Sequence, residues 1–343
     1  MKIMTGIDLH SNNAVCGLMD QDGKRLLQKK LPCDLDLILK TLAPYKAQIA
    51  QVAVESTYNW YWLVDGLEDH GYPVVLANPA KMKQYEGLKH TDDVSDVFYI
   101  CELMRLGILP VSHRYNRQTR PVRDLLRRRM MLVQQRTSLI LSFKSLHERT
   151  LGKRLRLKEV KSMSVEQAQA SFTDASDQLI CGEQVELMGQ FQESVARIEK
   201  HILAITKDWT TFQRVQEVPG IGTILGLTIA LETGEPSRFA SAGHFASYCR
   251  CVKSQRESNE KKKGENNRKC GNRYLGWAFV EAAHFAVRYD KKCQQFYERK
   301  KRKTNVAVAT KALACKLAKA AWHVMHDDLP YDPQRVFGGK RDA

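Results

Sequence analysis

The sequence lacks the features that mark membrane-spanning, zinc-binding and secreted proteins. No stretch approaches the roughly 20 consecutive apolar residues that a membrane-spanning helix needs. The nine cysteines are scattered singly and none of them forms a CxxC pair, so a zinc site is not expected. An odd number of cysteines, without a secretory signal at the start of the chain, fits a protein of the reducing cytosol.

Negative charge is also scarce relative to positive charge. The 343 residues include 54 Lys and Arg but 38 Asp and Glu, which gives a formal net charge of +16 and a pI of about 9.4. This balance favours a polyanionic partner, and nucleic acid before a membrane surface. The alternative is a protein that is merely basic, since net charge governs association and not fold.

A chain of this length predicts two or three domains, and the first, residues 1–112, has an α/β pattern. Three hairpin-type strands are followed by alternating helices and strands, which describes a mixed sheet with helices on its faces. The expected strands are residues 3–10, 14–19, 25–31, 51–55 and 72–77, and the expected helices are residues 35–43, 58–70, 80–88 and 94–106.

Four acidic residues of this domain form a candidate catalytic site. Asp8 lies inside an apolar strand, where a carboxylate costs free energy unless it is paired or holds a cation. Glu55 ends the fourth strand, a natural neighbour of the first, while Asp93 and Asp96 share one helical face. Carboxylates from three elements suit a hard divalent ion such as Mg²⁺. Asp92 is an alternative to Asp93, and each acid taken singly could instead be a helix cap, a turn residue or a solvated charge.

Residues 113–211 are expected to form a helical arm. Apolar residues recur at helical spacing from 122 to 150 and again from 183 to 209, with a polar linker between them. Two such helices pack either as an antiparallel arm or as a coiled coil between two chains. Bases interleaved with and following the first helix suit contacts with phosphate groups; a solvated helix face is the alternative. The candidate nucleic-acid contacts in this region are Arg123, Arg127, Arg128, Lys153 and Arg154.

Residues 212–330 predict a mainly helical domain with a second chemical centre, and residues 331–343 are expected to be a frayed tail. Gly220 and Gly222 predict a helix-hairpin-helix-type turn whose amides could hold a phosphate, although a tight turn between helices needs the same glycines. The polar segment that follows is expected to be a loop along a phosphate backbone, and Ser258 within it could act as a nucleophile among cations. Local backbone hydrogen bonding is the more common role of a loop serine. The bases of this segment are Arg256, Lys261, Lys262, Lys263, Arg268, Lys269 and Arg273.

Both ends of the chain resemble transposases of the insertion-sequence one-ten family. In the first domain the resemblance rests on Gly-Ile-Asp at 6–8, Val-Glu-Ser-Thr-Tyr at 54–58, Asn-Pro at 78–79 and Thr-Asp-Asp-Val-Ser-Asp at 91–96. In the last domain it rests on Pro-Gly-Ile-Gly at 219–222, Arg-Glu-Ser at 256–258 and Gly-Asn-Arg-Tyr-Leu at 271–275. The loop at 267–272 and the segment Trp-Ala-Phe-Val-Glu-Ala-Ala at 277–283 resemble the eleven-eleven subgroup.

The resemblance implies a RuvC-like (RNase H-like) DEDD domain, a helical arm and a transposase domain with a catalytic serine. It implies that Asp8, Glu55, Asp93 and Asp96 hold Mg²⁺ and that Ser258 forms a transient phosphoserine link to DNA, with Ser254 as the nearest rival. The implied partners are donor and target DNA, a structured non-coding guide (bridge) RNA, and further copies of the chain in a homodimer or homotetramer. The implied location is the bacterial cytoplasm, at the nucleoid.

Two other functions stay open at this point. In a Holliday-junction nuclease the acids would hydrolyse DNA with water, and Ser258 would be structural. In a non-catalytic nucleic-acid-binding protein the acids would be caps and turns, so that Asp8→Ala would leave DNA binding untouched.

Overall fold

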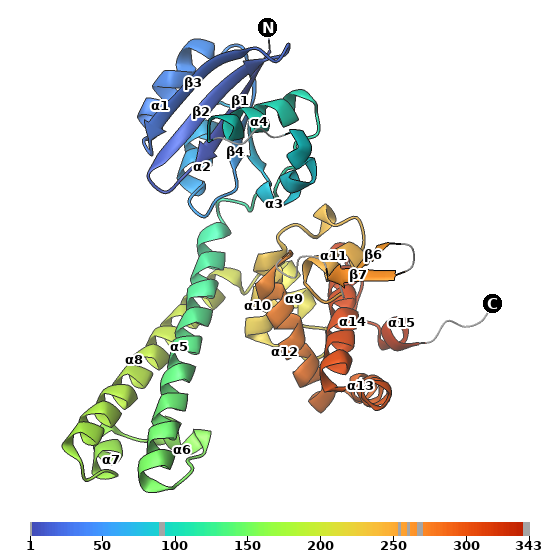
Figure 1. Ribbon diagram of the computed structural model, residues 1–343. Helices are drawn as coiled ribbons and strands as arrows, with labels where there is room; N and C mark the ends of the chain where they lie inside the picture. Colours follow the sequence, from blue (N-terminus) through green and yellow to red (C-terminus); the bar gives the residue numbers. More distant parts are fainter. Residues whose placement is uncertain (1, 89–92, 253–254, 259–260, 266–269, 339–343) are drawn as a thin grey trace. The chain divides into compact units, whose positions relative to one another are not determined.

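The chain divides into two compact units, Met1–Arg114 and Tyr115–Ala343. The structure is a computed structural model that describes residues 2–88, 93–252, 255–258, 261–265 and 270–338 (Figure 1). In the ranges 86–88, 93–95, 255–258 and 261–265 only the backbone is described. Among the described residues, no helix combines the length and apolar character that a membrane span requires.

The first unit is built on a five-stranded mixed sheet (Figure 1). Its strands are β1 (Ile3–Leu9), β2 (Asn13–Asp20), β3 (Arg25–Pro32), β4 (Ile49–Glu55) and β5 (Val74–Ala77). They lie in the order β3-β2-β1-β4-β5; β2 is antiparallel to both of its neighbours, whereas β1, β4 and β5 are parallel. The expected mixed sheet is confirmed, and so is the pairing of the first strand with the fourth.

Helices cover both faces of this sheet, as the alternation of side chains requires. The helices are α1 (Leu35–Leu42), α2 (Tyr61–Asp69), α3 (Pro79–Met82) and α4 (Asp93–Arg105), with 3-10 turns at Ala43–Tyr45 and Lys83–Leu88. Ile7 and Val54 belong to the core that also contains buried residues of α1 and α2. Val15 and Ala53 belong to the opposite core, which contains most of the buried face of α4. The expected helix over residues 80–88 is wrong, because Tyr85 has non-helical angles (φ −109°, ψ 16°) that divide it.

Helix α4 packs very close to the sheet because two glycines leave room for it. A Cβ atom at Gly6 would lie 2.6 Å from the carbonyl oxygen of Val97, and one at Gly17 would lie 2.9 Å from a methyl group of the same valine. Further along the helix, the Cys101 thiol donates to the Gly17 carbonyl oxygen at 3.4 Å, and the Arg105 guanidinium lies beside Gly23. Since Gly23 follows β2 at the end of the sheet where β1 begins, α4 runs antiparallel to β1. Its first turn therefore points towards the end of β1 that carries Asp8.

The second unit begins with an antiparallel helical arm (Figure 1). Its elements are α5 (Arg120–Leu151), α6 (Leu157–Ser162), α7 (Val165–Ala170) and α8 (Ala175–Thr206). Arg129 pairs with Glu199, while Gln184 donates to Ser142 at 2.9 Å, so the two long helices run in opposite directions. Of the two expected packings, the structure shows the arm within one chain. Helix α8 starts earlier than expected because Asp174 caps it by accepting from the amides of Ser176 and Asp177.

The arm is followed by a helical domain with one small hairpin. The helices are α9 (Thr210–Val215), α10 (Thr223–Thr233), α11 (Ala242–Tyr248), α12 (Arg273–Tyr289), α13 (Lys291–Lys303), α14 (Val306–His326) and α15 (Pro333–Phe337), with a 3-10 turn at Pro236–Arg238. Strands β6 (Gln255–Ser258) and β7 (Lys261–Glu265) pair in antiparallel fashion. Together with the mixed sheet, this confirms the expected α/β domain followed by a mainly helical region.

Two sequence expectations for this domain are wrong. The segment from 256 to 273 was expected to be a loop, but backbone pairing between β6 and β7 makes part of it a hairpin. The segment from 331 to 343 was expected to be a frayed tail, but it contains α15. That helix is held because the Phe337 ring packs 5.6 Å from the Phe296 ring and the Val336 carbonyl accepts from Lys316 at 2.5 Å.

We expect Gly6→Ala to destabilise the first unit by about 1–3 kcal/mol, because the added methyl group overlaps the backbone of α4 and no flexible side chain can yield. Gly189→Ala in α8 is the control, since a Cβ there meets nothing within 4 Å and alanine favours a helix. Hydrogen–deuterium exchange of β1 and α4 peptides measures both. Unchanged exchange in Gly6→Ala would show that α4 is not held by this contact.

Candidate functional site

Asp8 is a buried carboxylate near the end of β1. Its side chain is 8% exposed, and Oδ2 lies 3.3 Å from Nε2 of His10, whose own side chain is 46% exposed. Alternation along the strand places Asp8 on the same face as Gly6, which is the face that α4 covers. A buried carboxylate with one imidazole beside it is a group that a protein retains for a partner or a cation.

Glu55 lies next to Asp8 on the neighbouring strand. The register of the parallel pair joins Ile7 to Val54, so the next residue on each strand is Asp8 and Glu55. Ala53 belongs to the core beneath α4, and Glu55, two residues later, therefore faces the same side. The strand pairing thus brings two of the four candidate acids to one end and one face of the sheet.

The remaining acids belong to the start of α4. Asp96 is half-buried and directly precedes Val97, the residue whose carbonyl contacts Gly6. The backbone of Asp93 begins the helix, but its side chain lies outside the described atoms, and Asp92 lies outside the described residues. Within the described part of the chain, no group of three or more His, Cys, Asp or Glu side chains is arranged to hold a metal ion. The four-acid metal site therefore stays a prediction, supported so far by the placement of its elements.

Sequence reasoning missed two residues at this end of the sheet. Besides His10, whose ring approaches Asp8, there is Asn59, which follows β4 and donates from Nδ2 to the His10 carbonyl oxygen at 3.0 Å. The Thr57 hydroxyl in turn donates to Oδ1 of Asn59 at 2.9 Å. These bonds tie the ends of β1 and β4 together. The spacing Asp-x-His, which puts both side chains on one face of an extended chain, was the signal for His10; Asn59 had none.

The backbone places Ser258 at the end of β6. Ser258 pairs with Lys261 of β7, and Glu257 pairs with Lys262, so the serine is the last paired residue before the hairpin turn. The side chains of Arg256, Ser258 and Lys261–Lys263 lie outside the described atoms, and Ser254, Arg268 and Lys269 lie outside the described residues. The assignment of Ser258 as a nucleophile and the contacts of these bases with nucleic acid stay predictions.

Two arm residues expected to bind nucleic acid already have partners within the protein. The Arg123 side chain is only 6% exposed; its guanidinium lies 3.7 Å from the Tyr115 ring centre and 3.7 Å from Asp124. Arg127 donates to both carboxylate oxygens of Glu232, at 2.6 and 2.8 Å. Their positive charges are therefore matched by protein groups: Arg123 is buried, whereas Arg127, whose side chain is 32% exposed, already binds a carboxylate.

The Pro-Gly-Ile-Gly turn contains one structural glycine and one open one. Gly220 has a φ of +81°, and a Cβ atom there would lie 2.1 Å from the carbonyl oxygen of Ala282 in α12. Its role is tight packing between helices. Gly222 caps α10, is exposed, and has nothing within 4 Å of its Cβ position. Phosphate contact by the amides of this turn stays a prediction, and Gly222 is the more open of the two glycines.

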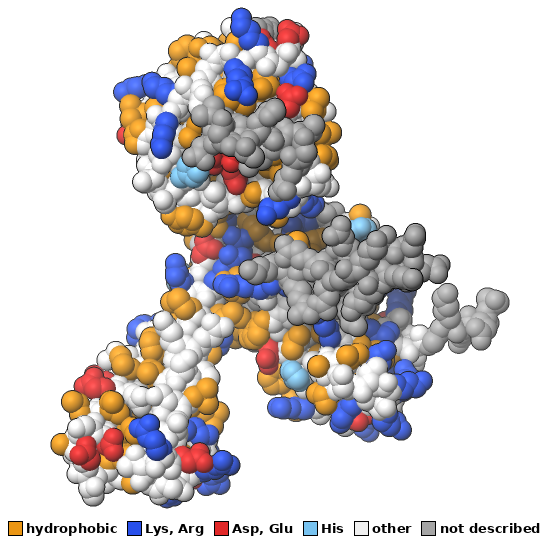
Figure 2. Space-filling model, viewed as in Figure 1, with side chains coloured by type: hydrophobic (Ala, Val, Ile, Leu, Met, Phe, Trp, Pro, Cys, Tyr) orange, Lys and Arg blue, Asp and Glu red, His pale blue; other side chains and the backbone are white. Residues whose placement is uncertain are grey.

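Exposed bases remain on the arm and on the last helices. Arg128, Lys153 and Arg154 are exposed, although Arg154 pairs with Glu148 at 2.6 Å, and Arg273 is exposed at the start of α12. Figure 2 shows further Lys and Arg side chains gathered over α13. The exposed bases of α13 are Lys291, Arg299, Lys301, Arg302 and Lys303. The exposed positive surface that suits a polyanion therefore includes Arg128 and Lys153 on the arm and the exposed bases of α13.

Comparison with known proteins now gives these elements a family. The DEDD transposase model of the IS110 type matches residues 5–150, and the model described as transposase, IS116/IS110/IS902 family, matches residues 212–298. The chain belongs to this transposase family. The first match spans the mixed sheet with the four acids, and the second spans the hairpin that carries Ser258.

Two relatives align with most of the chain. A probable family 20 transposase of Pseudomonas aeruginosa is 26% identical over 82% of this chain and 86% of that protein. The transposase for insertion sequence element IS1111A of Coxiella burnetii is 23% identical over 81% of this chain and 75% of that protein. Among solved structures, T. thermophilus RuvC in complex with Holliday junction substrate aligns with 14% identity and a TM-score of 0.26 over 33% of this chain and 100% of that chain. This last likeness is too weak to carry any argument.

Family membership makes the chain a DEDD-type transposase, a DNA-processing enzyme of an insertion sequence. DNA is its substrate class, and DEDD chemistry implies a divalent metal. The residues present fit such a metal, because Asp8 and Glu55 supply the hard oxygen ligands that these ions prefer. Burial raises the pKa of the Cys16 and Cys101 thiols to about 12, which disfavours the thiolate form that a metal would need.

We expect Arg128→Gln to weaken binding to a DNA duplex and to lower the slope of log K against log salt by about 0.7–0.9 if one phosphate contact is lost. Arg123→Gln is the matched variant on the same helix; it should lower thermal stability and leave the slope unchanged. Fluorescence anisotropy at several salt concentrations measures both slopes. An equal loss of slope in the two variants would contradict the assignment of Arg123 to the interior.

Proposed function

We propose that this transposase carries out Mg²⁺-dependent, RNA-guided exchange of DNA strands, with Ser258 as the nucleophile and a phosphoserine intermediate. The observation that carries the proposal is the meeting of β1, β4 and the start of α4 at one end of the sheet, with an acid on each. The serine, on the hairpin of the second unit, supplies the other half of the chemistry.

Helix geometry supports the grouping of the four acids. Val97 lies against Gly6, and the four residues from Val97 back to Asp93 cover about 6 Å along the helix axis. Two residues along β1, from Gly6 to Asp8, cover about 6.6 Å in the same direction. Because the helix and the strand are antiparallel, Asp93 and Asp8 therefore reach about the same level. Asp96 lies within the same turn, about 1.5 Å from the level of Val97 and so between the levels of Gly6 and Asp8.

Asp8, Glu55, Asp93 and Asp96 are the residues that would hold the ion, with Asp92 as an alternative to Asp93. A bound divalent cation would offset the negative charge that develops on a phosphate under attack. The chain's own contribution is to fix the carboxylates. Asn59 holds the His10 backbone, and His10 lies against Oδ2 of Asp8, so the carboxylate is oriented from its outer side.

The serine step conserves the phosphodiester. Oγ of Ser258 bonds to phosphorus, one P–O bond to the deoxyribose breaks, and the hydroxyl proton ends on the freed sugar oxygen. A new DNA end then reverses the step by attacking the phosphoserine. Exchange of this kind needs no nucleotide cofactor, because the number of phosphoester bonds does not change.

Guide RNA and assembly complete the proposal. The exposed bases of the arm and those near α13 form two separate basic regions, which would serve RNA and DNA, and strand exchange between two DNA duplexes favours a homodimer or homotetramer. The net charge of +16 favours binding of such polyanions.

We expect Ser258→Ala to abolish recombination between a donor and a target plasmid and to abolish a covalent protein–DNA adduct trapped on a nicked substrate. DNA affinity should stay within about twofold, since one neutral hydroxyl contributes little to phosphate binding. Omission of the flanking non-coding RNA should abolish recombination by the wild type as well. Metal-dependent cleavage without any adduct would support a nuclease instead, and Ser254→Ala is the matched control.

We expect Asp8→Asn to lower the rate of recombination by at least about 100-fold, because the ion would lose a charged ligand and phosphoryl transfer depends on such stabilisation. EDTA should do the same to the wild type, and Mg²⁺ should restore it. Asp22→Asn, a substitution in the β2–β3 turn, is the control. If Asp8→Asn recombines at the wild-type rate, the acids are not a metal site.

A further inference from the structure

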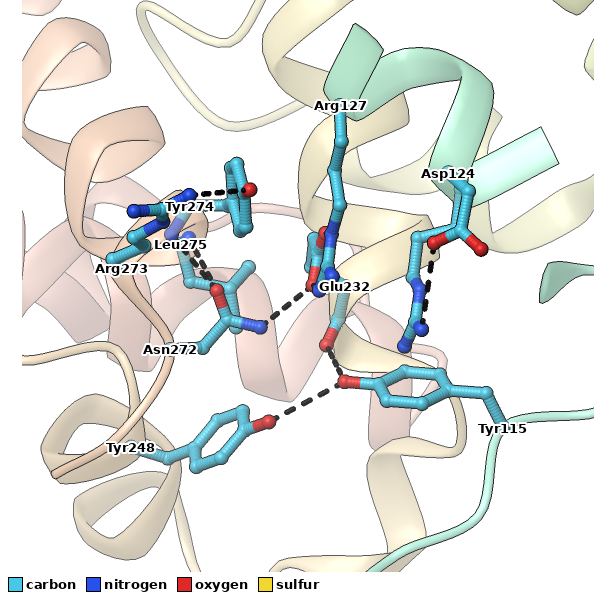
Figure 3. Close-up of polar contacts among 10 residues, drawn as sticks. Tyr115, Asp124, Arg127, Glu232, Tyr248, Asn272, Arg273, Tyr274 and Leu275 are labelled. Atoms are coloured by element: carbon cyan, nitrogen blue, oxygen red, sulfur yellow. Dashed lines mark hydrogen bonds and ion pairs between the residues drawn. The ribbon is translucent and has the colours of Figure 1, made fainter. Parts of the chain in front are cut away.

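A buried carboxylate in the second unit accepts three hydrogen bonds from two partners. Glu232 of α10 has a side chain only 2% exposed and receives both hydrogen bonds from Arg127 of α5. The Asn272 amide donates to Oε2 of the same carboxylate at 2.7 Å. These contacts are shown in Figure 3. Removal of one partner from such a buried ion pair strongly destabilises a protein, because the other charge is left buried without a counter-charge.

Asn272 connects this carboxylate to the start of α12. Its Oδ1 accepts from the amides of Tyr274 and Leu275, at 2.8 and 3.2 Å, and so caps the helix. The two ends of one side-chain amide thus hold two elements at once (Figure 3). The rotation of this amide is fixed, since only the NH₂ end can serve Glu232 and only the oxygen can cap.

Asn272 also joins the two ends of the segment that carries the hairpin with Ser258. We call these two ends, residues 248–250 and 271–272, the hairpin stem. The backbone N–H of Asn272 donates to the Tyr248 carbonyl oxygen at 2.7 Å. The Arg250 guanidinium donates twice to the Gly271 carbonyl oxygen, at 3.1 and 2.9 Å. Gly271 has a φ of +87°, and a Cβ atom there would lie 2.4 Å from the Tyr248 carbonyl oxygen. Both ends of the segment between α11 and α12 are therefore fastened together directly beside Glu232.

The arm is fastened at the same point. Besides Arg127, the Tyr115 hydroxyl donates to the Glu232 carbonyl oxygen at 2.8 Å and lies 3.3 Å from the Tyr248 hydroxyl. Burial opposes the charge of Arg127, but the hydrogen bonds and charge of Glu232 outweigh this effect and hold the pKa of Arg127 above its usual range. The arm helix α5, the hairpin stem and the start of α12 are thus all held at one residue, Glu232.

We propose that Glu232 and Asn272 are positioning residues for Ser258, which hold the stem of its hairpin at a fixed place against arm helix α5. The proposal rests on the proposed function of Ser258 and adds one requirement to it. The hydrogen bond from the Asn272 side-chain amide to the Glu232 carboxylate must be intact for Ser258 to reach the DNA phosphate. Both residues act through the hairpin stem, so they are positioning residues and not catalytic ones. A misplacement of about 1 Å is enough to slow a reaction about 100-fold.

The test uses a donor–acceptor swap. Asn272→Asp keeps an oxygen that caps α12 but turns the amide donor into a second carboxylate facing Glu232. Adding Glu232→Gln to the same chain restores a donor and an acceptor with their roles exchanged: the side chain at 232 now donates and the side chain at 272 accepts. We expect Asn272→Asp to lower the rate of adduct formation on saturating nicked DNA by about 10–100-fold, with DNA affinity within about twofold, and the double variant to recover most of the rate.

Amide hydrogen exchange separates this proposal from the role of Ser258. Asn272→Asp should speed exchange in residues 255–258 and 261–265 more than in the middle of α14, and the double variant should reverse this. Arg129→Gln is the control, since Arg129 lies two residues after Arg127 on α5 and pairs with Glu199 of α8. If the wild type forms no serine adduct, the nucleophile is wrong, while the exchange data still decide whether the stem is held.

Three results would overturn the proposal. The first is wild-type adduct formation and exchange in Asn272→Asp. The second is a defect that Glu232→Gln fails to relieve. The third is a loss confined to thermal stability and affinity at an unchanged rate per bound complex, which marks an ordinary buried ion pair.

Discussion

The close approach of α4 to β1 is the constraint on which the candidate catalytic site depends. Two strands that pair in register can bring Asp8 beside Glu55, but a third element must deliver the other acids. Gly6 and Gly17 let the helix backbone lie where side chains would otherwise keep it away. The helix then runs antiparallel to β1, and this direction turns its first residues towards Asp8. Without these glycines the same acids would lie at a greater height above the sheet.

Much of the first unit could be predicted because its pattern is local. The turn between β2 and β3, the alternation along each strand and the caps of the helices are all written in neighbouring residues, and the strands were confirmed to within about two residues. The position of Asp8 beside Glu55 followed from strand order. Asn59 was missed because its contact with His10 joins residues 49 positions apart, whereas the Asp-x-His spacing was a local signal for His10 that was not used.

The second unit shows where charge patterns mislead. Arg123, Arg127 and Arg128 look alike in the sequence, since all three belong to one basic run on a helix. Only tertiary packing separates them: Arg123 lies over Tyr115, Arg127 binds Glu232, and Arg128 is exposed. A guanidinium can serve a carboxylate or a phosphate with the same geometry, so its residue type does not decide which. The burial of Glu232, more than a hundred residues away, decides it for Arg127.

The same reasoning explains why the bases near α13 differ from those at the start of α5. Glu298 is the single acid within α13, and Lys301 approaches it at 3.5 Å, so most of the helix's positive charge has no partner of opposite sign on that helix. Near the helix C-terminus the macrodipole stabilises these cations at about 0.3–1 kcal/mol each, which is enough to favour a helix but too little to explain five exposed bases in one short element. At the start of α5 the positive charge instead balances buried acid and aromatic surface, so it fixes structure. Net charge therefore indicates a polyanionic partner for the whole chain, whereas burial and pairing determine which residues remain available to it.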